Sequence, residues 1–264
     1  MKRINIFEFE DIKFLSSDFR ACLTNLIIVF HKLMGSKQVL VNVITELKQK
    51  QSFSTIVDIG SGSGGIMPEV INAYNSQNKG DKISLILSDL YPNKGIVEQV
   101  NGGGEKNISY LKTSLNACEL SKAPKGLKTL ICSFHHLSPE IAGAILRSAQ
   151  ENKEPILIYE MINRNIPKIL FPVYFLATVV LTLCLTPFVR PLRMKQIAYT
   201  YCLPLIPFCF SWDALASIVR LYSFKDIHEL IGESDKETYE WTMKDVLNAK
   251  GRKCGHYILG QPKL

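Results

Sequence analysis

The chain has 264 residues, of which 47% are hydrophobic and 21% charged, as expected for one globular domain that carries an elaboration. Its formal net charge of +7 favours anionic partners (nucleic acid, an anionic membrane or an acidic substrate) without choosing among them. The seven cysteines form no CxxC pair and no cysteine–histidine cluster with zinc spacing, and the first residues lack the apolar core of a secretory signal. We therefore expect a cytoplasmic protein with reduced cysteines and no bound metal.

Two helices are predicted before the first strand. Apolar residues recur at helical spacing over 12–34, and Gly35 is a typical stop signal. A second helix is predicted over 36–49, with Ser36 as its N-cap. We expect residues 1–50 to form a helical lid.

Strands and helices then alternate along the chain. Short apolar runs predict strands near 53–59, 83–88, 107–112, 127–133 and 155–159, with helices over 64–76, 93–101 and 139–150. This alternation predicts βαβ units and a mostly parallel sheet with both faces covered. Near the end, Ser223 caps a predicted helix over 224–232. Strands at 238–242 and 256–259 share only a short polar link at 250–253, so they should be antiparallel.

An apolar insertion separates these two parts. Ile169 to Val189 is a run of 21 residues without a charge, and a second apolar block runs from Ile197 to Trp212. Arg190, Arg193 and Lys195 lie between the blocks. We expect a core over 51–163, a hydrophobic helical insertion over 164–222, and a final segment over 223–264 that completes the core.

The insertion is long enough to reach a membrane, but its topology limits how. Strands on both sides of it join one sheet, so the chain returns to the side it left. A two-span hairpin would put the three cations on the far side, against the positive-inside preference. We therefore expect an interfacial hairpin over 166–212 at the inner face of a membrane, peripheral or monotopic. The alternative is a buried helical cap or a dimer interface in a soluble enzyme; the oligomeric state stays open.

A glycine-rich turn follows the first predicted strand, in the run Val57 to Gly65. Glycines here let the backbone approach a ligand and turn tightly into a helix. The same residues also fit the GxGxxG pattern of dinucleotide sites. Asp58 directly precedes the turn, where a carboxylate would repel a pyrophosphate but suits the ammonium and sulfonium groups of S-adenosylmethionine. Asp89, at the end of the second strand, can accept hydrogen bonds from ribose hydroxyls.

The order and spacing of these motifs resemble the class I S-adenosylmethionine-dependent methyltransferases, over about 53–162 and 223–261, in their small-molecule and lipid-type branch. The resemblance implies a Rossmann-like α/β fold: a seven-stranded, mostly parallel sheet with a reversed C-terminal strand, helices on both faces, and here a hydrophobic helical insertion after strand five. It also implies S-adenosylmethionine as cofactor. The implied cofactor-binding residues are Asp58, Gly60, Ser61, Gly62, Gly64, Asp89, Leu90, Asn116, Ala117 and Ser133. Asn116 stands where the family usually has Asp, although an amide oxygen can accept the same hydrogen bond from adenine.

Three residues are candidates for catalysis. His135 and His136 follow strand four, beside the expected methyl group, where an imidazole could serve as a base or could only position backbone and cofactor. Asp213 follows Trp212 and could contact substrate or cap a following helix. Methyl transfer from a sulfonium needs positioning above all, so a base is not required.

These observations predict methyl transfer, on oxygen, to a hydrophobic, lipid-like or membrane-associated small molecule, with no nucleic-acid partner. The positive charge also suggests an RNA or protein methyltransferase, but no basic patch interleaved with aromatic residues is present. Two further hypotheses are a membrane-associated protein that keeps the fold without activity and an NAD-dependent oxidoreductase. Fold alone does not give substrate.

Overall fold

The computed structural model describes residues 3–12, 14–162, 166–232, 237–247, 251 and 253–263, with Cys254 described by its backbone alone. The expected boundary at 163–164 lies outside this range, as does part of the expected polar link at 250–253. Nine α-helices occur within the described residues: α1 (Ser17–Met34), α2 (Ser36–Lys50), α3 (Met67–Gln77), α4 (Lys94–Gly102), α5 (Pro139–Glu151), α6 (Phe171–Leu185), α7 (Met194–Ile197), α8 (Leu205–Arg220) and α9 (Phe224–Ile231).

The centre of the fold is one seven-stranded sheet in the order β3-β2-β1-β4-β5-β7-β6. Its strands are β1 (Thr55–Ile59), β2 (Ser84–Ser88), β3 (Ile108–Tyr110), β4 (Leu127–Ile131), β5 (Ile156–Glu160), β6 (Tyr239–Leu247) and β7 (Lys253–Pro262). The first five strands pair in parallel, while β7 is antiparallel to both β5 and β6. The predicted mostly parallel sheet with a reversed C-terminal strand is confirmed, and so is the antiparallel final pair.

Helices cover both faces of the sheet. Neighbouring residues of each buried strand point to opposite sides, so each strand contributes to two clusters. Leu157 and Tyr159 of β5 join a cluster with α2 and α3, whereas Ile156 and Ile158 join a cluster with α5 and α9. A strand buried on both faces needs a continuous apolar run rather than an alternating one. The run Pro155–Tyr159 has this composition.

Two predicted helix starts are wrong in detail. The first long helix begins at Ser17 rather than residue 12, because the Ser16 side chain caps it by accepting the N–H of Phe19. The second helix has Gly35, in the left-handed conformation, as its N-cap. Ser36 is instead the first helical residue, and it is buried beside Met161 of the core. The Ser223 cap is confirmed, with a reciprocal capping box to Asp226.

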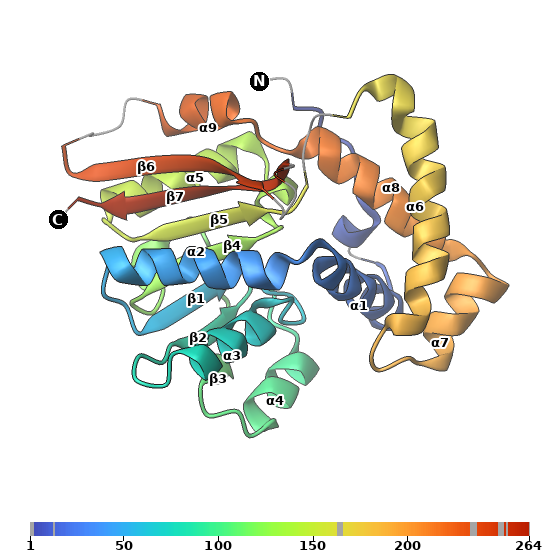
Figure 1. Ribbon diagram of the computed structural model, residues 1–264, viewed down its shortest axis with the longest axis horizontal. Helices are drawn as coiled ribbons and strands as arrows, with labels where there is room; N and C mark the ends of the chain where they lie inside the picture. The colour runs from blue at the N-terminus through green and yellow to red at the C-terminus, as the bar shows by residue number, and fades with distance from the viewer. Residues whose placement is uncertain are drawn as a thin grey trace.

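A third layer lies beyond the carboxyl ends of the parallel strands (Figure 1). It contains α1, α6, α7 and α8. Apolar side chains of α1 and α8 form a separate cluster here, around Leu26 and Phe210. Residues 3–12, here termed the N-terminal strap, run along this layer: the N–H of Ile4 donates to the carbonyl of Val219 (2.9 Å), and the Trp212 indole donates to the carbonyl of Phe7 (3.0 Å).

The helix α6 is oriented against the usual rule for soluble proteins. Its buried residues are Thr178 and Thr182, while Val173, Leu176 and Val180 are each about 60% exposed (63%, 64% and 59%). The continuous helical stretch Lys168–Phe188 is long and apolar enough to cross a membrane, with a mean hydropathy of 2.3. Contiguous exposed apolar faces are typical of surfaces that contact a membrane or another protein.

One close backbone approach in the central sheet gives a test of the fold. Gly126 precedes β4 with φ of +138°, and a Cβ atom there would overlap the carbonyl oxygen of Thr55 at the start of β1. We expect Gly126→Ala to lower the free energy of unfolding by about 2 to 4 kcal/mol, measured by chemical denaturation. Gly80→Ala is the matched control, because its Cβ would meet open space and should cost under about 0.5 kcal/mol. Equal losses in both variants would contradict this packing.

Candidate active site

The glycine-rich turn joins β1 to α3 at the carboxyl edge of the sheet. Gly60 and Gly64 have φ of +70° and +102°, a region that other residues rarely adopt. The backbones of Gly60 and Gly62 are exposed, whereas Ser61 and Gly64 are buried. The turn therefore presents the peptide groups of Gly60 and Gly62 to an incoming ligand, while the buried Ser61 and Gly64 anchor it.

Asp58 lies beneath this turn rather than on its surface. One carboxylate oxygen accepts the hydroxyl of Thr129 and the other that of Ser61, each at 2.7 Å. The side chain is buried, and burial raises its pKa to about 6 despite those two hydrogen bonds. Its visible contacts hold the turn in shape, and direct contact with a cofactor stays a prediction.

Asp89 faces the turn from the end of β2. Its carboxylate accepts the N–H of Gly62 at 3.0 Å and the N–H of Tyr91 at 2.9 Å. The exposed Leu90 follows, and its carbonyl accepts the hydroxyl of Ser114 at 2.7 Å. Asp89 is thus fixed beside the exposed glycines, and its contact with a ribose stays a prediction.

The last three predicted cofactor residues lie around the same turn. The N–H of Leu115 donates to the carbonyl of Asp89 at 3.0 Å, which brings the exposed Asn116 and the half-buried Ala117 beside it. The Asn116 side chain accepts the N–H of Cys118 at 3.0 Å. Ser133 follows β4, and a Cβ on Gly60 would lie 3.7 Å from its hydroxyl oxygen, which is buried without a hydrogen-bond partner. A buried, unpaired hydroxyl aimed at the turn is a group that a ligand could satisfy.

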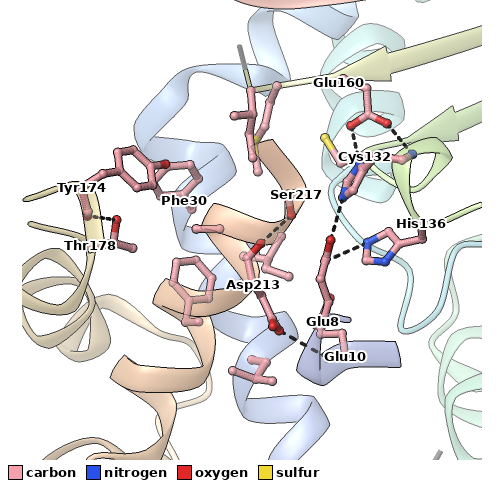
Figure 2. A pocket seen from close by; sticks show the side chains of 17 residues that line it. Glu8, Glu10, Phe30, Cys132, His136, Glu160, Tyr174, Thr178, Asp213 and Ser217 are labelled. Atoms are coloured by element: carbon pink, nitrogen blue, oxygen red, sulfur yellow. Dashed lines mark hydrogen bonds and ion pairs between the residues drawn. The ribbon is translucent and has the colours of Figure 1, made fainter. Parts of the chain in front are cut away.

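A cavity that is partly open to solvent adjoins this edge of the sheet. The strap, the ends of β4 and β5, and helices α1, α6 and α8 supply its walls (Figure 2). Most of the lining is apolar. Glu8, His135, His136 and Glu160 form one polar wall. The lining residues are Glu8, Glu10, Leu23, Ile27, Phe30, Cys132, His135, His136, Glu160, Met161, Ile162, Tyr174, Thr178, Phe210, Asp213, Ala214 and Ser217.

Both predicted histidines belong to the polar wall. His135 Nδ1 lies 2.8 Å from one carboxylate oxygen of Glu160. The other oxygen of Glu160 accepts the backbone N–H of His135 at 3.1 Å. Although burial opposes it, the charge and hydrogen bonds of His135 hold the pKa of Glu160 below its ordinary value. His136 Nδ1 lies 3.0 Å from Asp11 of the strap. Each ring is therefore oriented by a carboxylate at Nδ1, which leaves Nε2 to face the cavity.

Glu8 and Arg220 complete the polar wall. Arg220 lies 3.3 Å from Glu8 and pairs with Asp11, and its Nη2 donates to the carbonyl of His136 at 2.8 Å. Burial raises the pKa of Glu8 to about 7. The hydrogen bonds of His136 and Arg220 hold the pKa of Asp11 below its ordinary value, against the effect of burial.

The structure corrects one interpretation of Asp213. This residue is inside α8, which begins at Leu205, so it caps no helix. Its carboxylate accepts the N–H of Phe9 at 2.6 Å and that of Glu10 at 3.3 Å, and burial raises its pKa to about 7. Asp213 lines the cavity, but its hydrogen bonds attach the strap to α8, and a substrate role stays a prediction.

No protein-family profile and no curated protein sequence matches the chain. Solved structures do. The plantazolicin methyltransferase BpumL in complex with SAH aligns with a TM-score of 0.55 at 12% identity, over 95% of this chain and 92% of that chain. BpumL in complex with a monoazolic desmethylPZN analog and SAH gives 0.54 at 12% identity, over 94% and 91%. The protein has the class I methyltransferase fold. A third structure, the O-methyltransferase NcsB1 from neocarzinostatin biosynthesis with S-adenosylmethionine and 2-hydroxy-5-methyl naphthoic acid, aligns at a TM-score of 0.43 and 14% identity, over 86% and 56%.

Within this methyltransferase fold, sequence analysis missed the strap and Arg220. Glu8, Glu10 and Asp11 are the only acids before α1 in the described chain, yet no periodicity marks them. One signal was available in the apolar helix α8. Its only charged residues, Asp213 and Arg220, are seven positions apart and so share a face.

The burial of Asp58 predicts a pH effect on the stability of this methyltransferase fold. Its pKa is about 6 in the folded protein against 3.8 for the ordinary group, so the folded state binds the proton more tightly. The contribution of this tighter proton binding to the free energy of unfolding is fully present below about pH 4 and is lost as pH rises through 6. We expect the free energy of unfolding of the wild type to fall by about 2 kcal/mol relative to Asp58→Asn between pH 4 and 7.

Thermal and urea unfolding across that pH range would measure this difference. Glu98→Gln, on the exposed side of α4, controls for the loss of one acid. A pH profile of Asp58→Asn that parallels the wild type would show that the Asp58 proton is not bound more tightly on folding.

Proposed function

We propose that the protein is an S-adenosylmethionine-dependent methyltransferase that methylates an oxygen of a hydrophobic small molecule. The observation that carries this proposal is that the exposed glycine turn after β1 and a mostly apolar cavity with one polar wall, at the ends of β4 and β5, lie at the same carboxyl edge of one sheet. Such an arrangement can hold a nucleoside cofactor at the glycine turn and a hydrophobic acceptor with one polar group in the cavity.

On the cofactor side, each proposed contact has a geometric basis. The exposed peptide groups of Gly60 and Gly62 approach the methionine part, and Asp89 binds the ribose hydroxyls. Asn116 reaches the adenine amino group, and the Ser133 hydroxyl gains a partner at the turn. Solved structures of the same fold hold SAH, which is the product of methyl donation.

The glycine turn also argues against a dinucleotide cofactor. A pyrophosphate at this position would need the free N–H groups at the start of the helix. The N–H of Gly62 already donates to Asp89, and the buried Asp58 lies directly below. Two carboxylates at this site disfavour a doubly charged anion and tolerate a cationic sulfonium.

On the acceptor side, the polar wall meets the substrate's polar group. Nε2 of His135 and Nε2 of His136 both face Glu8 at the cavity, so this group can meet a substrate hydroxyl, while the apolar lining orients the rest of the molecule. Holding acceptor oxygen, methyl carbon and sulfur in line supplies much of the rate of such a displacement.

The proposed acceptor is lipid-like because the helix that closes the cavity is also the exposed apolar helix. Tyr174 and Thr178 of α6 line the cavity, while Leu176 and Val180 of the same helix are exposed. We propose that this exposed face rests on the cytoplasmic surface of a membrane, from which the acceptor enters. Arg190 and Arg193 follow the helix and would meet anionic headgroups.

Cofactor binding is the first test of this proposal. We expect purified protein to bind S-adenosylhomocysteine in calorimetry, and Asp89→Ala to weaken binding about 10- to 100-fold through the loss of charge-assisted hydrogen bonds. Asp81→Ala, before the start of the same strand, is the matched control and should bind normally. Binding of NADH in place of S-adenosylhomocysteine would overturn the proposal.

Transfer of labelled methyl groups then tests the acceptor class. With labelled S-adenosylmethionine and a lysate containing membranes, we expect label in the organic extract that disappears with Asp89→Ala. Label in precipitated RNA or protein would instead support the alternative substrate classes.

Membrane contact is tested by flotation with vesicles that contain anionic lipid. We expect the wild type to float and Leu176→Glu/Val180→Glu to stay with the soluble fraction, because a charge in the apolar layer costs about 2 to 3 kcal/mol. Ile141→Glu/Leu247→Glu is the matched control, since both residues are exposed and apolar but lie away from α6 (45% and 58% exposed). Equal flotation of both double variants would contradict a docking role for α6.

A further inference from the structure

Three side chains of the polar wall converge on one point. Glu8 of the strap and His135 and His136 after β4 each offer a ligand atom, and these atoms all lie within 4.8 Å of one another. Glu8 is 2% exposed and His135 is 4% exposed, so the group is shielded from bulk water. Figure 2 shows Glu8 and His136 pointing toward each other at the cavity.

The separations within this group are too long for hydrogen bonds. His136 Nε2 is 3.6 Å from one Glu8 oxygen, and His135 Nε2 is 3.9 Å from the other. That second oxygen, Glu8 Oε1, is buried with no hydrogen-bond partner among the described residues, and its neighbouring cation is Arg220, whose Nη1 forms an ion pair with it at 3.3 Å. In a tetrahedral zinc site with bonds of about 2.0 to 2.1 Å, neighbouring ligand atoms are about 3.3 to 3.4 Å apart. The observed gaps are therefore close to those that an ion spans.

The outer contacts of both rings are those of metal-binding histidines. A carboxylate oxygen of Glu160 lies 2.8 Å from Nδ1 of His135, and one of Asp11 lies 3.0 Å from Nδ1 of His136. If each Nδ1 carries the proton toward its carboxylate, each Nε2 presents a lone pair to Glu8. A lone pair that faces a carboxylate oxygen is repelled by it unless a proton or a metal ion lies between them.

The site is also rich in acid. The carboxyl groups of Glu8, Asp11 and Glu160 surround the two imidazoles. Arg220 pairs with Glu8 and Asp11 and also donates to the backbone carbonyls of the histidine turn. It therefore shapes the site from one side and leaves the space between Glu8 and the imidazole Nε2 atoms to a cation.

We propose that Glu8, His135 and His136 bind a divalent transition-metal ion whose open coordination position faces the cavity. Two imidazole nitrogens and one carboxylate favour zinc and its first-row neighbours over magnesium or calcium. The inference replaces the expectation of no metal, which rested on cysteine spacing and could not detect ligands far apart in sequence.

A role in catalysis follows if the proposed function holds. The ion would polarise an acceptor hydroxyl at its open position and lower the pKa of that group. The proton passes to solvent, the acceptor oxygen forms a bond to the methyl carbon, and the carbon–sulfur bond breaks to release S-adenosylhomocysteine. The metal changes no oxidation state.

The test uses full-length protein stripped with a chelator and then titrated with zinc ion in calorimetry. We expect one equivalent to bind, with affinity lowered at least about 100-fold in His136→Ala and in Glu8→Gln. His228→Ala removes an exposed histidine of α9 and should bind as the wild type does. Thermal unfolding of each variant without metal shows whether it is folded, and substitution with cobalt ion gives a visible spectrum that reports nitrogen and oxygen ligands.

Each result has one meaning. Binding that is no stronger in the wild type than in the two folded ligand variants, or that falls equally in His228→Ala, would overturn the metal site. Binding of S-adenosylhomocysteine is measured on the same preparations. If it binds while zinc does not, only the metal inference fails; if zinc binds one equivalent while S-adenosylhomocysteine does not bind, the proposed function fails and the site stands.

Discussion

The guanidinium of Arg220 joins three parts of the chain that are distant in sequence. It belongs to the end of α8, donates to backbone carbonyls of the histidine turn after β4, and pairs with Glu8 and Asp11 of the strap. Arg3 of the strap donates in turn to the carbonyls of Arg220 and His135, at 2.7 and 2.8 Å. A buried guanidinium is tolerated only when its donors find partners. The shape of the cavity depends on this junction, because the three walls that it holds belong to no common secondary structure.

The sheet could be predicted from the sequence because its signals are local. Runs such as Pro155–Tyr159 indicate both a strand and its burial on two faces, and the glycines after β1 indicate a turn with positive φ. Helix starts were less certain, since Ser16 and Ser36 are equally good caps on paper and only tertiary packing buried Ser36.

The polar wall could be predicted only in part. His135, His136 and Glu160 follow strands, so their place at the carboxyl edge is a consequence of topology. Glu8 and Asp11 come from a segment with no periodicity, and they reach the wall across 125 residues or more of chain. Sequence spacing carries no information about such a contact. Asp213 was predicted as a substrate-contacting acid or, alternatively, a helix cap. Only the cap is wrong, because the apolar block before Asp213 gave no sign that it was already helical.

The orientation of α6 was likewise invisible in the sequence, because a helix that is apolar all round has no preferred face. In the structure its threonines turn inward. The Thr178 hydroxyl donates to the Tyr174 carbonyl at 2.8 Å, so its burial costs little, whereas the buried Thr182 hydroxyl has no hydrogen-bond partner among the described residues. The opposite face of α6 is left for an apolar surround. The exposed face of α6 and the cavity are thus two sides of one wall.

The strap also has a consequence for synthesis. Residues 3–12 are made before the rest of the fold, and their partners Asp213, Val219 and Arg220 come more than 200 residues later. At about 5 to 20 residues per second, the acids of the strap remain in water for roughly 10 to 40 s before those partners exist. The core strands β1 to β5 can pair within that interval, so the cavity is closed last, by residues made well before its other walls. A nascent chain paused within the apolar insertion would hold a sheet with an open edge at β5 and an apolar helix without its packing partners. In that state the protein would most need a membrane or a chaperone nearby.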